Sequence, residues 1–240
     1  MPDRRVHRGP HPEDARWFAD GIEPLLFQAT SDLRWLLSRG YAPKSALKLV
    51  GDRYDLVARQ RTAVGRCACS DMQAEDRRRR RISPEQVRGQ TLWLDGYNVL
   101  VSVEAALSGG LILIGCDGAS RDMASMHGSY RKVSETRPAL QLIGKTLAAL
   151  EVGRCLWYLD SPVSNSGRLM KIIREVAADA GWDWDVELVR NPDTILSQTE
   201  QLISTADSVV LDLCGDWFDL AGETIGREVP QAWTLELGRP

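Results

Sequence analysis

Apolar residues in the first third of the chain repeat at the spacing of an α-helix. Intervals of three and four residues place one apolar face over residues 22–37, and Gly40 stands where that helix would end. Two more helical patterns follow, one opening with Pro43 and one near Leu56, and proline suits the first turn of a helix. The pattern predicts an all-helical module over residues 19–69.

Two segments beside this module are too polar to predict packed structure. Residues 1–18 are charged and contain three prolines, so we expect a disordered leader there. Residues 70–90 hold few apolar side chains and a run of five arginines at 77–81. Runs of like charge usually form solvated tethers, although arginine also binds nucleic-acid phosphate. We therefore expect an arginine-rich linker over residues 70–90.

The apolar pattern changes after residue 90. Short apolar runs bounded by Gly, Asp, Asn or Ser alternate with amphipathic stretches, as strands alternate with helices. Strands are expected at residues 92–94, 111–115, 155–159, 186–189 and 208–211. Helices are expected over residues 140–150, 169–180 and 196–206. The alternation predicts an α/β domain over residues 91–240, with a mostly parallel sheet flanked by helices.

Composition excludes several classes of protein. The 240 residues are 43% hydrophobic and 26% charged, which is typical of a soluble globular chain. The longest apolar run, residues 111–116, is far shorter than the roughly 20 residues of a membrane span. The first residues have no apolar stretch typical of a secretory signal, and the five cysteines are scattered rather than arranged as a disulfide framework. We therefore expect a cytoplasmic protein with no membrane partner.

Charge divides at the same point as the apolar pattern. Residues 1–90 carry 18 Lys and Arg against 12 Asp and Glu, whereas residues 91–240 carry 12 against 21. The overall net charge of −3 thus combines a basic part with an acidic one. An acidic site that acts on a polyanion needs basic groups nearby, so this division fits a nucleic acid as partner.

Aspartates end four of the five expected strands. They are Asp95, Asp117, Asp160 and Asp212. The carboxyl ends of parallel strands lie along one edge of the sheet, where ligands bind, so we expect the four to converge. Carboxylates in one place stay ionised together only when a cation lies among them, and oxygen ligands favour Mg²⁺ or Mn²⁺. Each aspartate alone also has an ordinary interpretation, because aspartate often caps the helix that follows a strand.

Neighbouring residues complete this candidate site. In the segment Asp95-Gly-Tyr-Asn98, Gly96 permits a sharp turn, and Asn98 can aim its amide at the same point as the carboxylate. We expect Asp95, Asn98 and Asp160 to be the catalytic residues. Asp207 and Asp216 flank Asp212, and either is an alternative or an addition to it.

A second group of residues is suited to bind phosphate. Small polar residues before an expected helix leave backbone N–H groups free for an anion, although ordinary helix capping explains the same pattern. A polar loop earlier in the chain adds cations, Tyr130 for stacking on a base, and His127 as a candidate general acid or base. The expected phosphate-binding residues are Ser164, Asn165, Ser166, Gly167, Arg168, Arg131 and Lys132.

The segment LWLDGYNVL resembles the first strand and metal-binding turn of PIN-like nucleases, especially the NYN branch. The whole chain is similar to a family of prokaryotic proteins that join a short helical module of unknown function to a PIN-like domain. The segments that carry this similarity are residues 32–54, 94–100, 116–131 and 159–169.

The resemblance implies a nuclease fold and a set of metal-binding acids. Asp95 matches the first-strand ligand, Asn98 the residue of its turn, and Asp160 and Asp212 the later strand-end acids. PIN-like domains commonly add an acid from a helix, for which Glu104 and Glu135 are both candidates. Such domains often pair, so a homodimer is a further expectation.

Two functions follow from these patterns. The first is a Mg²⁺- or Mn²⁺-dependent nuclease that hydrolyses RNA phosphodiesters through a metal-activated water. The second is a non-catalytic adaptor with a PIN-like fold that binds RNA or protein. A phosphatase or nucleotide-binding enzyme, with residues 164–167 as its phosphate loop, is a weaker third alternative, because the chain has no P-loop pattern.

Overall fold

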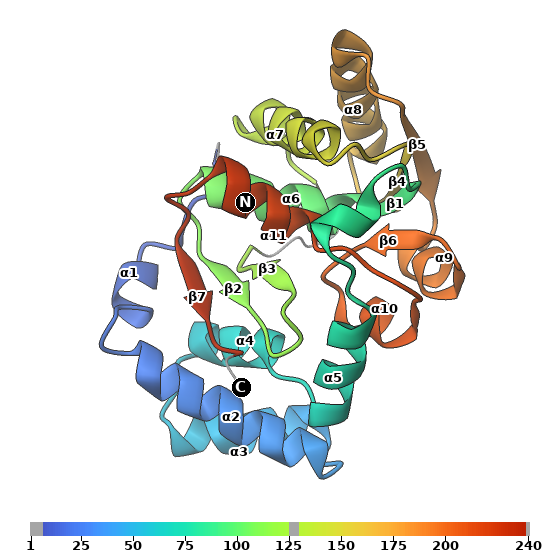
Figure 1. Cartoon of the computed structure of the whole chain (residues 1–240). Coiled ribbons are helices and arrows are strands. Elements are labelled where there is room, and N and C mark those ends of the chain that lie inside the picture. Colours follow the sequence, from blue (N-terminus) through green and yellow to red (C-terminus); the bar gives the residue numbers. More distant parts are fainter. Residues whose placement is uncertain (1–6, 125–129, 239–240) are drawn as a thin grey trace.

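The structure is a computed structural model that describes residues 7–124 and 130–238 (Figure 1). Its first part is helical, as the apolar pattern predicts, and is followed by an α/β part. The helices of the first part are α1 (Asp14–Trp17), α2 (Glu23–Ser38), α3 (Pro43–Arg53), α4 (Ala58–Cys67) and α5 (Asp71–Arg80). Between residues 7 and 124 and between 130 and 238, none of the helices has the length and apolar character needed to cross a bilayer.

Helix α5 corrects the expectation of a linker over residues 70–90. Ser70 and Gln73 form a capping box, in which Ser70 Oγ accepts from the Gln73 N–H and Gln73 Oε1 accepts from the Ser70 N–H. Within the arginine run, Arg80 pairs with Asp76 one turn earlier at 2.6 Å, and the Arg77 side chain is only 2% exposed. These caps and ion pairs offset the repulsion between neighbouring arginines, so the segment packs as a helix, with a 3-10 turn at Pro84–Val87 after it.

Part of the expected disordered leader is also packed. Asp14 at the start of α1 is fully buried, and Arg59 of α4 donates to its carboxylate at 2.7 Å. Phe18 is buried in the same cluster as α2 and α4. Residues 7–18 therefore belong to the folded molecule, whereas residues 1–6 lie outside the described part.

The main sheet has four parallel strands in the order β5-β4-β1-β6. They are β1 (Leu92–Asp95), β4 (Cys155–Asp160), β5 (Trp184–Val189) and β6 (Leu202–Ser204). Residue pairing places Leu94 opposite Ser204, so Asp95 projects one residue past the end of β6. This arrangement confirms the expected parallel sheet flanked by helices.

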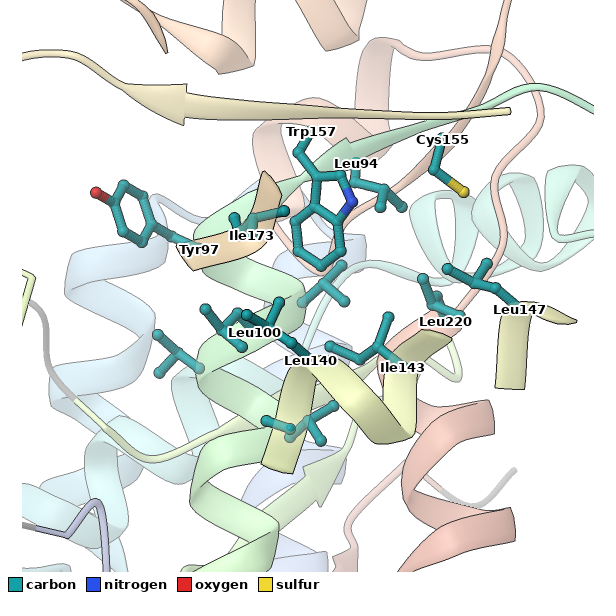
Figure 2. Packing of buried hydrophobic residues seen from close by; sticks show 14 of the residues in the cluster. Leu94, Tyr97, Leu100, Leu140, Ile143, Leu147, Cys155, Trp157, Ile173 and Leu220 are labelled. Atoms are coloured by element: carbon teal, nitrogen blue, oxygen red, sulfur yellow. The ribbon is translucent and has the colours of Figure 1, made fainter. Parts of the chain in front are cut away.

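Helices cover both faces of this sheet. One face packs on α6 (Gly96–Leu107), α7 (Thr136–Ala149), α8 (Ser166–Ala180) and α11 (Leu220–Glu228), and the other on α9 (Pro192–Gln198) and α10 (Ser208–Leu213). Leu94 and Trp157 point to the first face, where they meet Leu140 and Ile143 of α7 (Figure 2). Tyr158, next to Trp157 in the chain, points to the second face. This two-residue alternation is the periodicity of a strand buried on both sides.

A second sheet joins the helical module to the α/β part. It has the order β3-β2-β7 and consists of β2 (Ile112–Ile114), β3 (Ser120–Asp122) and β7 (Thr234–Glu236). Leu113 of β2 and Leu235 of β7 are buried in one cluster with Leu33 of α2 and Val64 of α4. The module therefore shares a hydrophobic core with strands from the middle and the end of the chain.

One expected strand is wrong. Residues 208–211 begin helix α10, because the Asp207 carboxylate accepts from the N–H groups of Val209 and Val210 and so caps a helix. The fourth strand of the main sheet is β6, which lies inside the helix expected over residues 196–206. A short apolar run does not distinguish a buried strand from a buried helical turn, so the pattern alone could not place β6.

Candidate functional site

The order of the strands indicates where a ligand would bind at the carboxyl edge of the main sheet. From β1 the chain adds β4 and then β5 on one side, and it returns to place β6 on the other side of β1. In open parallel sheets, ligands bind where the direction of winding reverses, which here is between β1 and β6. Asp95 ends β1, and Thr205 follows β6 and donates to the Asp95 carboxylate at 2.8 Å. The first predicted catalytic residue thus lies at this point.

Asp95 is held tightly and is 4% exposed. Asn98 donates to its carboxylate from Nδ2 at 2.6 Å and from the backbone N–H at 3.3 Å. Burial raises the pKa of Asp95 to about 7, against the lowering effect of Thr205 and Asn98, and the negative charges of Asp193 and Asp207 add to the rise. Asp95 therefore changes charge near neutral pH, and a cation at this edge would favour its ionised form.

Gly96 follows Asp95 because the chain passes close to β4. A Cβ atom at this position would lie 2.6 Å from Leu159 Cδ2 and 2.9 Å from the carbonyl oxygen of Tyr158. The second of these is backbone and has little freedom to move away. The Asp-Gly-x-Asn pattern therefore reflects packing between the start of α6 and β4, as well as the position of the carboxylate.

Three more carboxylates lie near Asp95. Asp160 ends β4, the strand beside β1, and its pKa is raised by partial burial and then by the charge of Asp193. Asp193 lies in the first turn of α9, and its pKa is raised by burial and by Asp207. We call Asp95, Asp160, Asp193 and Asp207 the edge carboxylates. The charge of Asp193 raises the pKa values of Asp95 and Asp160, and the charge of Asp207 raises those of Asp95 and Asp193, which is typical of a site that accommodates a cation.

Sequence reasoning identified part of this group. Asp95 and Asp160 were expected, and Asp207 was an alternative to Asp212. Asp193 was missed, although it stands four residues after the end of β5, where a functional loop residue is common. The signal that could have found it is therefore its position relative to the strand, not its residue type.

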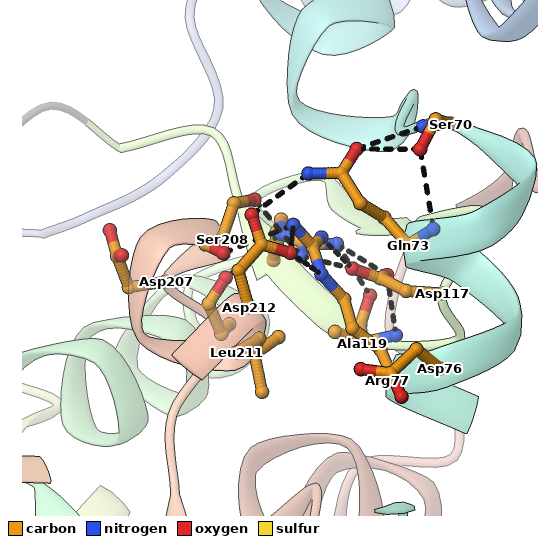
Figure 3. Close-up of polar contacts among 12 residues, drawn as sticks. Ser70, Gln73, Asp76, Arg77, Asp117, Ala119, Asp207, Ser208, Leu211 and Asp212 are labelled. Carbon is orange, nitrogen blue, oxygen red and sulfur yellow. Dashed lines mark hydrogen bonds and ion pairs between the residues drawn. The ribbon is translucent and has the colours of Figure 1, made fainter. Parts of the chain in front are cut away.

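Asp117 and Asp212 do not join the edge carboxylates, which corrects the expected four-aspartate site. Asp117 follows β2 in the second sheet, and Asp212 lies on helix α10 rather than at a strand end. Both bind Arg77 of α5 (Figure 3). The Arg77 guanidinium donates to Asp117 at 2.7 Å and to Asp212 at 2.6 and 2.8 Å.

This ion-pair cluster has a structural role. Arg121 binds Asp117 through two hydrogen bonds of 2.8 and 2.7 Å, and Gln73 donates to Asp212 at 2.8 Å. Burial alone would raise the pKa of Asp117, but Arg121 and Arg77 hold it far below its ordinary value. A carboxylate neutralised by two arginines is a poor metal ligand, because the cations already occupy its oxygens.

The edge carboxylates suit a cation that needs few protein ligands. Across the parts of the chain that the structure describes, no group of three or more His, Cys, Asp or Glu residues is arranged to hold a metal ion. Mg²⁺ commonly keeps several waters and uses only one or two carboxylates together with substrate phosphate. Asp95 and Asp160, at the ends of adjacent strands, supply two such carboxylates. The donor set therefore fits a hydrated hard cation rather than a cage of four carboxylates.

A cavity of about 340 Å³ opens beside this edge. It is lined by Asn98 and Asp207 from the α/β part and by Arg66 of α4. Arg66 donates to the backbone oxygens of Asp122 and Ala124, which holds its positive charge at the wall. The helical module thus contributes one side of the cavity that adjoins the edge carboxylates.

Four of the seven expected phosphate-binding residues line a second cavity, of about 210 Å³. Its walls include Arg131, Lys132, Asn165 and Arg168. Ser164, Ser166 and Gly167 do not line this cavity. The Ser164 backbone oxygen accepts from the Tyr130 N–H, and the buried Ser166 hydroxyl bonds to the Tyr97 hydroxyl. At Gly167, an added Cβ would meet nothing within 4 Å. His127 lies outside the described residues.

The two candidate helix acids have other partners. Glu104 of α6 is fully buried and binds Arg8, the Tyr130 hydroxyl and the Thr136 hydroxyl, the last two at 2.6 Å. Glu135 binds His7 at 2.5 Å. Both acids therefore anchor the N-terminal segment and the loop after residue 129 rather than extending the edge carboxylates.

Comparison with known proteins identifies two matching families. The family described as "Protein of unknown function (DUF434)" matches residues 25–80, and "Domain of unknown function (DUF5616)" matches residues 84–223. An uncharacterized protein of Methanocaldococcus jannaschii is 32% identical over 184 residues, which cover 77% of this chain and 88% of that protein. No solved structure matches. Helix α5, with Arg77, belongs to the first matched segment, and the edge carboxylates belong to the second.

Proposed function

This chain belongs to the family of the domain of unknown function DUF5616, and we propose that it is a divalent-metal-dependent nuclease with a PIN-like domain that hydrolyses RNA phosphodiesters. The observation that carries this proposal is the position of Asp95. Its buried carboxylate ends β1 at the reversal of strand order, and its pKa is raised by burial and by neighbouring carboxylates.

The edge carboxylates together would bind Mg²⁺ or Mn²⁺. Asp95 and Asp160 are the proposed ligands, and Asp193 and Asp207 add negative charge around them. When bound, such a metal supplies an activated water and neutralises charge on the phosphoryl oxygens. Asn98 holds the Asp95 carboxylate in place through its side chain and its backbone N–H. Arg66, at the wall of the larger cavity, provides a cation for substrate phosphate.

Three features support a nucleic acid as substrate. The edge carboxylates are flanked by one cavity with Arg66 and another with Arg131, Lys132 and Arg168. Such neighbours attract a polyanion to an acidic site. The Asp-Gly-x-Asn pattern at 95–98 resembles the NYN branch of PIN-like nucleases, and RNA is proposed on that resemblance.

The proposal is tested by comparing metal binding and cleavage in matched variants. Mn²⁺ binding is measured by calorimetry, and cleavage of a mixed-sequence single-stranded RNA is followed in parallel. Asp95→Asn is expected to lose both, because the amide cannot supply the negative charge. Asp216→Asn is the control, since Asp216 is exposed and lies outside the edge carboxylates. A wild-type protein that binds no Mn²⁺ and cleaves no RNA would overturn the proposal.

One observation favours the alternative of a non-catalytic adaptor that binds RNA or protein. Arg77 occupies two of the four carboxylates that the sequence suggested as ligands, and the described residues contain no three-ligand group. An adaptor would bind its target equally well with Asp95 or with Asn at that position. The same pair of variants therefore separates the two functions.

A further inference from the structure

We propose that the cavity of about 210 Å³ at the start of helix α8 binds a phosphate group of the RNA strand, away from the bond that is cleaved. We call it the phosphate cavity. This inference rests on the proposed function, because it adds a substrate-anchoring site to the same molecule. It concerns binding rather than chemistry, so it can be tested without turnover.

Three cations line the phosphate cavity, and none of them has a neutralising partner among the residues that the structure describes. Within residues 7–124 and 130–238, the side chains of Arg131, Lys132 and Arg168 form no hydrogen bond or ion pair. Other arginines on nearby helices are paired, such as Arg137 with Glu175 and Arg174 with Asp185. Three unpaired cations around one cavity favour an anion with several acceptor oxygens, which describes a phosphate.

The loop that carries two of these cations is anchored by a buried network. The Tyr130 hydroxyl bonds to Glu104 at 2.6 Å and to Thr136 at 2.9 Å, and the Arg8 guanidinium lies 5.1 Å from the centre of its ring. Arg8 also donates to the backbone oxygen of Arg131 at 3.1 Å. Because the backbone is held in place, a ligand has to order only the side chains of the cations, which lowers the entropic cost of binding.

The opposite wall is anchored to the same loop. Asn165 adopts a left-handed conformation, with φ of 73°, and its Nδ2 donates to the Tyr130 backbone oxygen at 2.9 Å. The Asn165 side chain therefore does not cap α8, and the helix begins without a side-chain cap. The N–H groups of Ser166 and Arg168 donate to the backbone oxygens of Val163 and Asn165, and the dipole of the helix adds partial positive charge to that of the three cations.

The phosphate cavity is close in the chain and in the structure to the edge carboxylates. The Ser166 hydroxyl lies 2.5 Å from the backbone oxygen of Asp160 and 2.7 Å from the hydroxyl of Tyr97. Tyr97 lines the larger cavity, and its ring lies 5.4 Å from that of Tyr130, which lines the phosphate cavity. A strand that reaches the edge carboxylates therefore has an anion site beside its path.

The test measures binding of a fluorescent single-stranded RNA by anisotropy with divalent metals chelated, so that no cleavage takes place. Arg168→Gln and Arg131→Gln are each expected to weaken binding about tenfold at low salt, the loss expected for a charged hydrogen bond. Each is also expected to flatten the dependence of log affinity on log salt by roughly 0.7. Lys171→Gln is the matched control, because Lys171 is an exposed cation on the same helix outside the cavity.

Two RNAs distinguish the source of the phosphate. A preference for 5′-phosphorylated over 5′-hydroxyl RNA that disappears in Arg168→Gln supports a terminal phosphate as ligand, and equal loss with both RNAs supports a backbone phosphate. Wild-type affinity in both Arg168→Gln and Arg131→Gln, with unchanged melting temperatures, would overturn the inference. Failure of the proposed function is a separate result, namely intact RNA binding without metal-dependent cleavage in the wild type.

Discussion

Asp95 shows how strongly a single residue depends on its surroundings. Burial raises its pKa to about 7 from the ordinary 3.8, while hydrogen bonds from Thr205 and Asn98 offset only part of that rise. The folded chain therefore binds this proton more tightly than the unfolded chain does. Below about pH 4, ionisation of Asp95 does not lower the free energy of unfolding. Between about pH 4 and pH 7 it lowers that free energy increasingly, and above about pH 7 the loss is constant.

Replacement of this carboxylate by a neutral amide is expected to stabilise the protein at alkaline pH. In metal-free buffer, Asp95→Asn should raise the free energy of unfolding at about pH 8 by at most about 4 kcal/mol, and the gain should vanish near pH 4. Urea unfolding of both proteins at several pH values measures this difference. Asp216→Asn, at an exposed position, should show no such trend. A gain independent of pH would show that the pKa of Asp95 is not raised.

At the scale of elements, local patterns predicted most of the fold. Strand β4 and helix α8 lie where apolar runs and helical periodicity placed them, because each buries a face defined by its own residues. The strand expected at 208–211 failed because the Asp207 cap outweighs the strand preference of a short apolar run. Residues 202–204 form β6 because they pair with β1, a contact between distant parts of the chain that periodicity does not contain.

The same difference between local patterns and long-range contacts explains which residues of the candidate site could be predicted. Asp95 and Asp160 could be predicted because the end of a strand is a local feature, and their neighbouring strands bring them to one edge. Asp117 and Asp212 could not be interpreted correctly, because Arg77 lies 40 and 135 residues away from them in the chain. The arginine run suggested a tether because the partners of Arg77 are distant in the chain, although the Ser70 cap and the Asp76 partner of Arg80 are local.

Helix α5 is therefore expected to depend on Arg77 and not on the arginine run as a whole. Arg77→Met leaves Asp212 without its cation and the buried Asp117 with Arg121 alone, so it should lower the free energy of unfolding by about 3 kcal/mol. Arg79→Met is the control from the same run, since the Arg79 side chain is 73% exposed, and should change it by less than about 0.5 kcal/mol. Chemical denaturation of the two variants checks the contrast. Equal effects would mean that the ion-pair cluster adds no stability.

At the scale of the whole molecule, the two matched family segments form one folded unit. The cluster that contains Leu33 and Val64 of the helical module also contains Leu113 of β2 and Leu235 of β7. Arg77 adds a polar connection from α5 to α10 on another side of the molecule. Because Arg66 of the module lines the cavity beside the edge carboxylates, this shared core also sets the shape of the candidate site.

A shared core predicts that the module and the α/β part unfold together. Leu113→Ala removes a fully buried side chain from the shared cluster and should lower the free energy of unfolding by about 2–5 kcal/mol. Helical circular dichroism and tryptophan fluorescence should shift to the same lower urea midpoint, since both report one transition. Leu213→Ala, at a side chain that is 65% exposed, should leave the midpoint almost unchanged. Two separated transitions in Leu113→Ala would instead show that the module unfolds independently, and Arg66 would then adjoin the edge carboxylates only while the module stays folded.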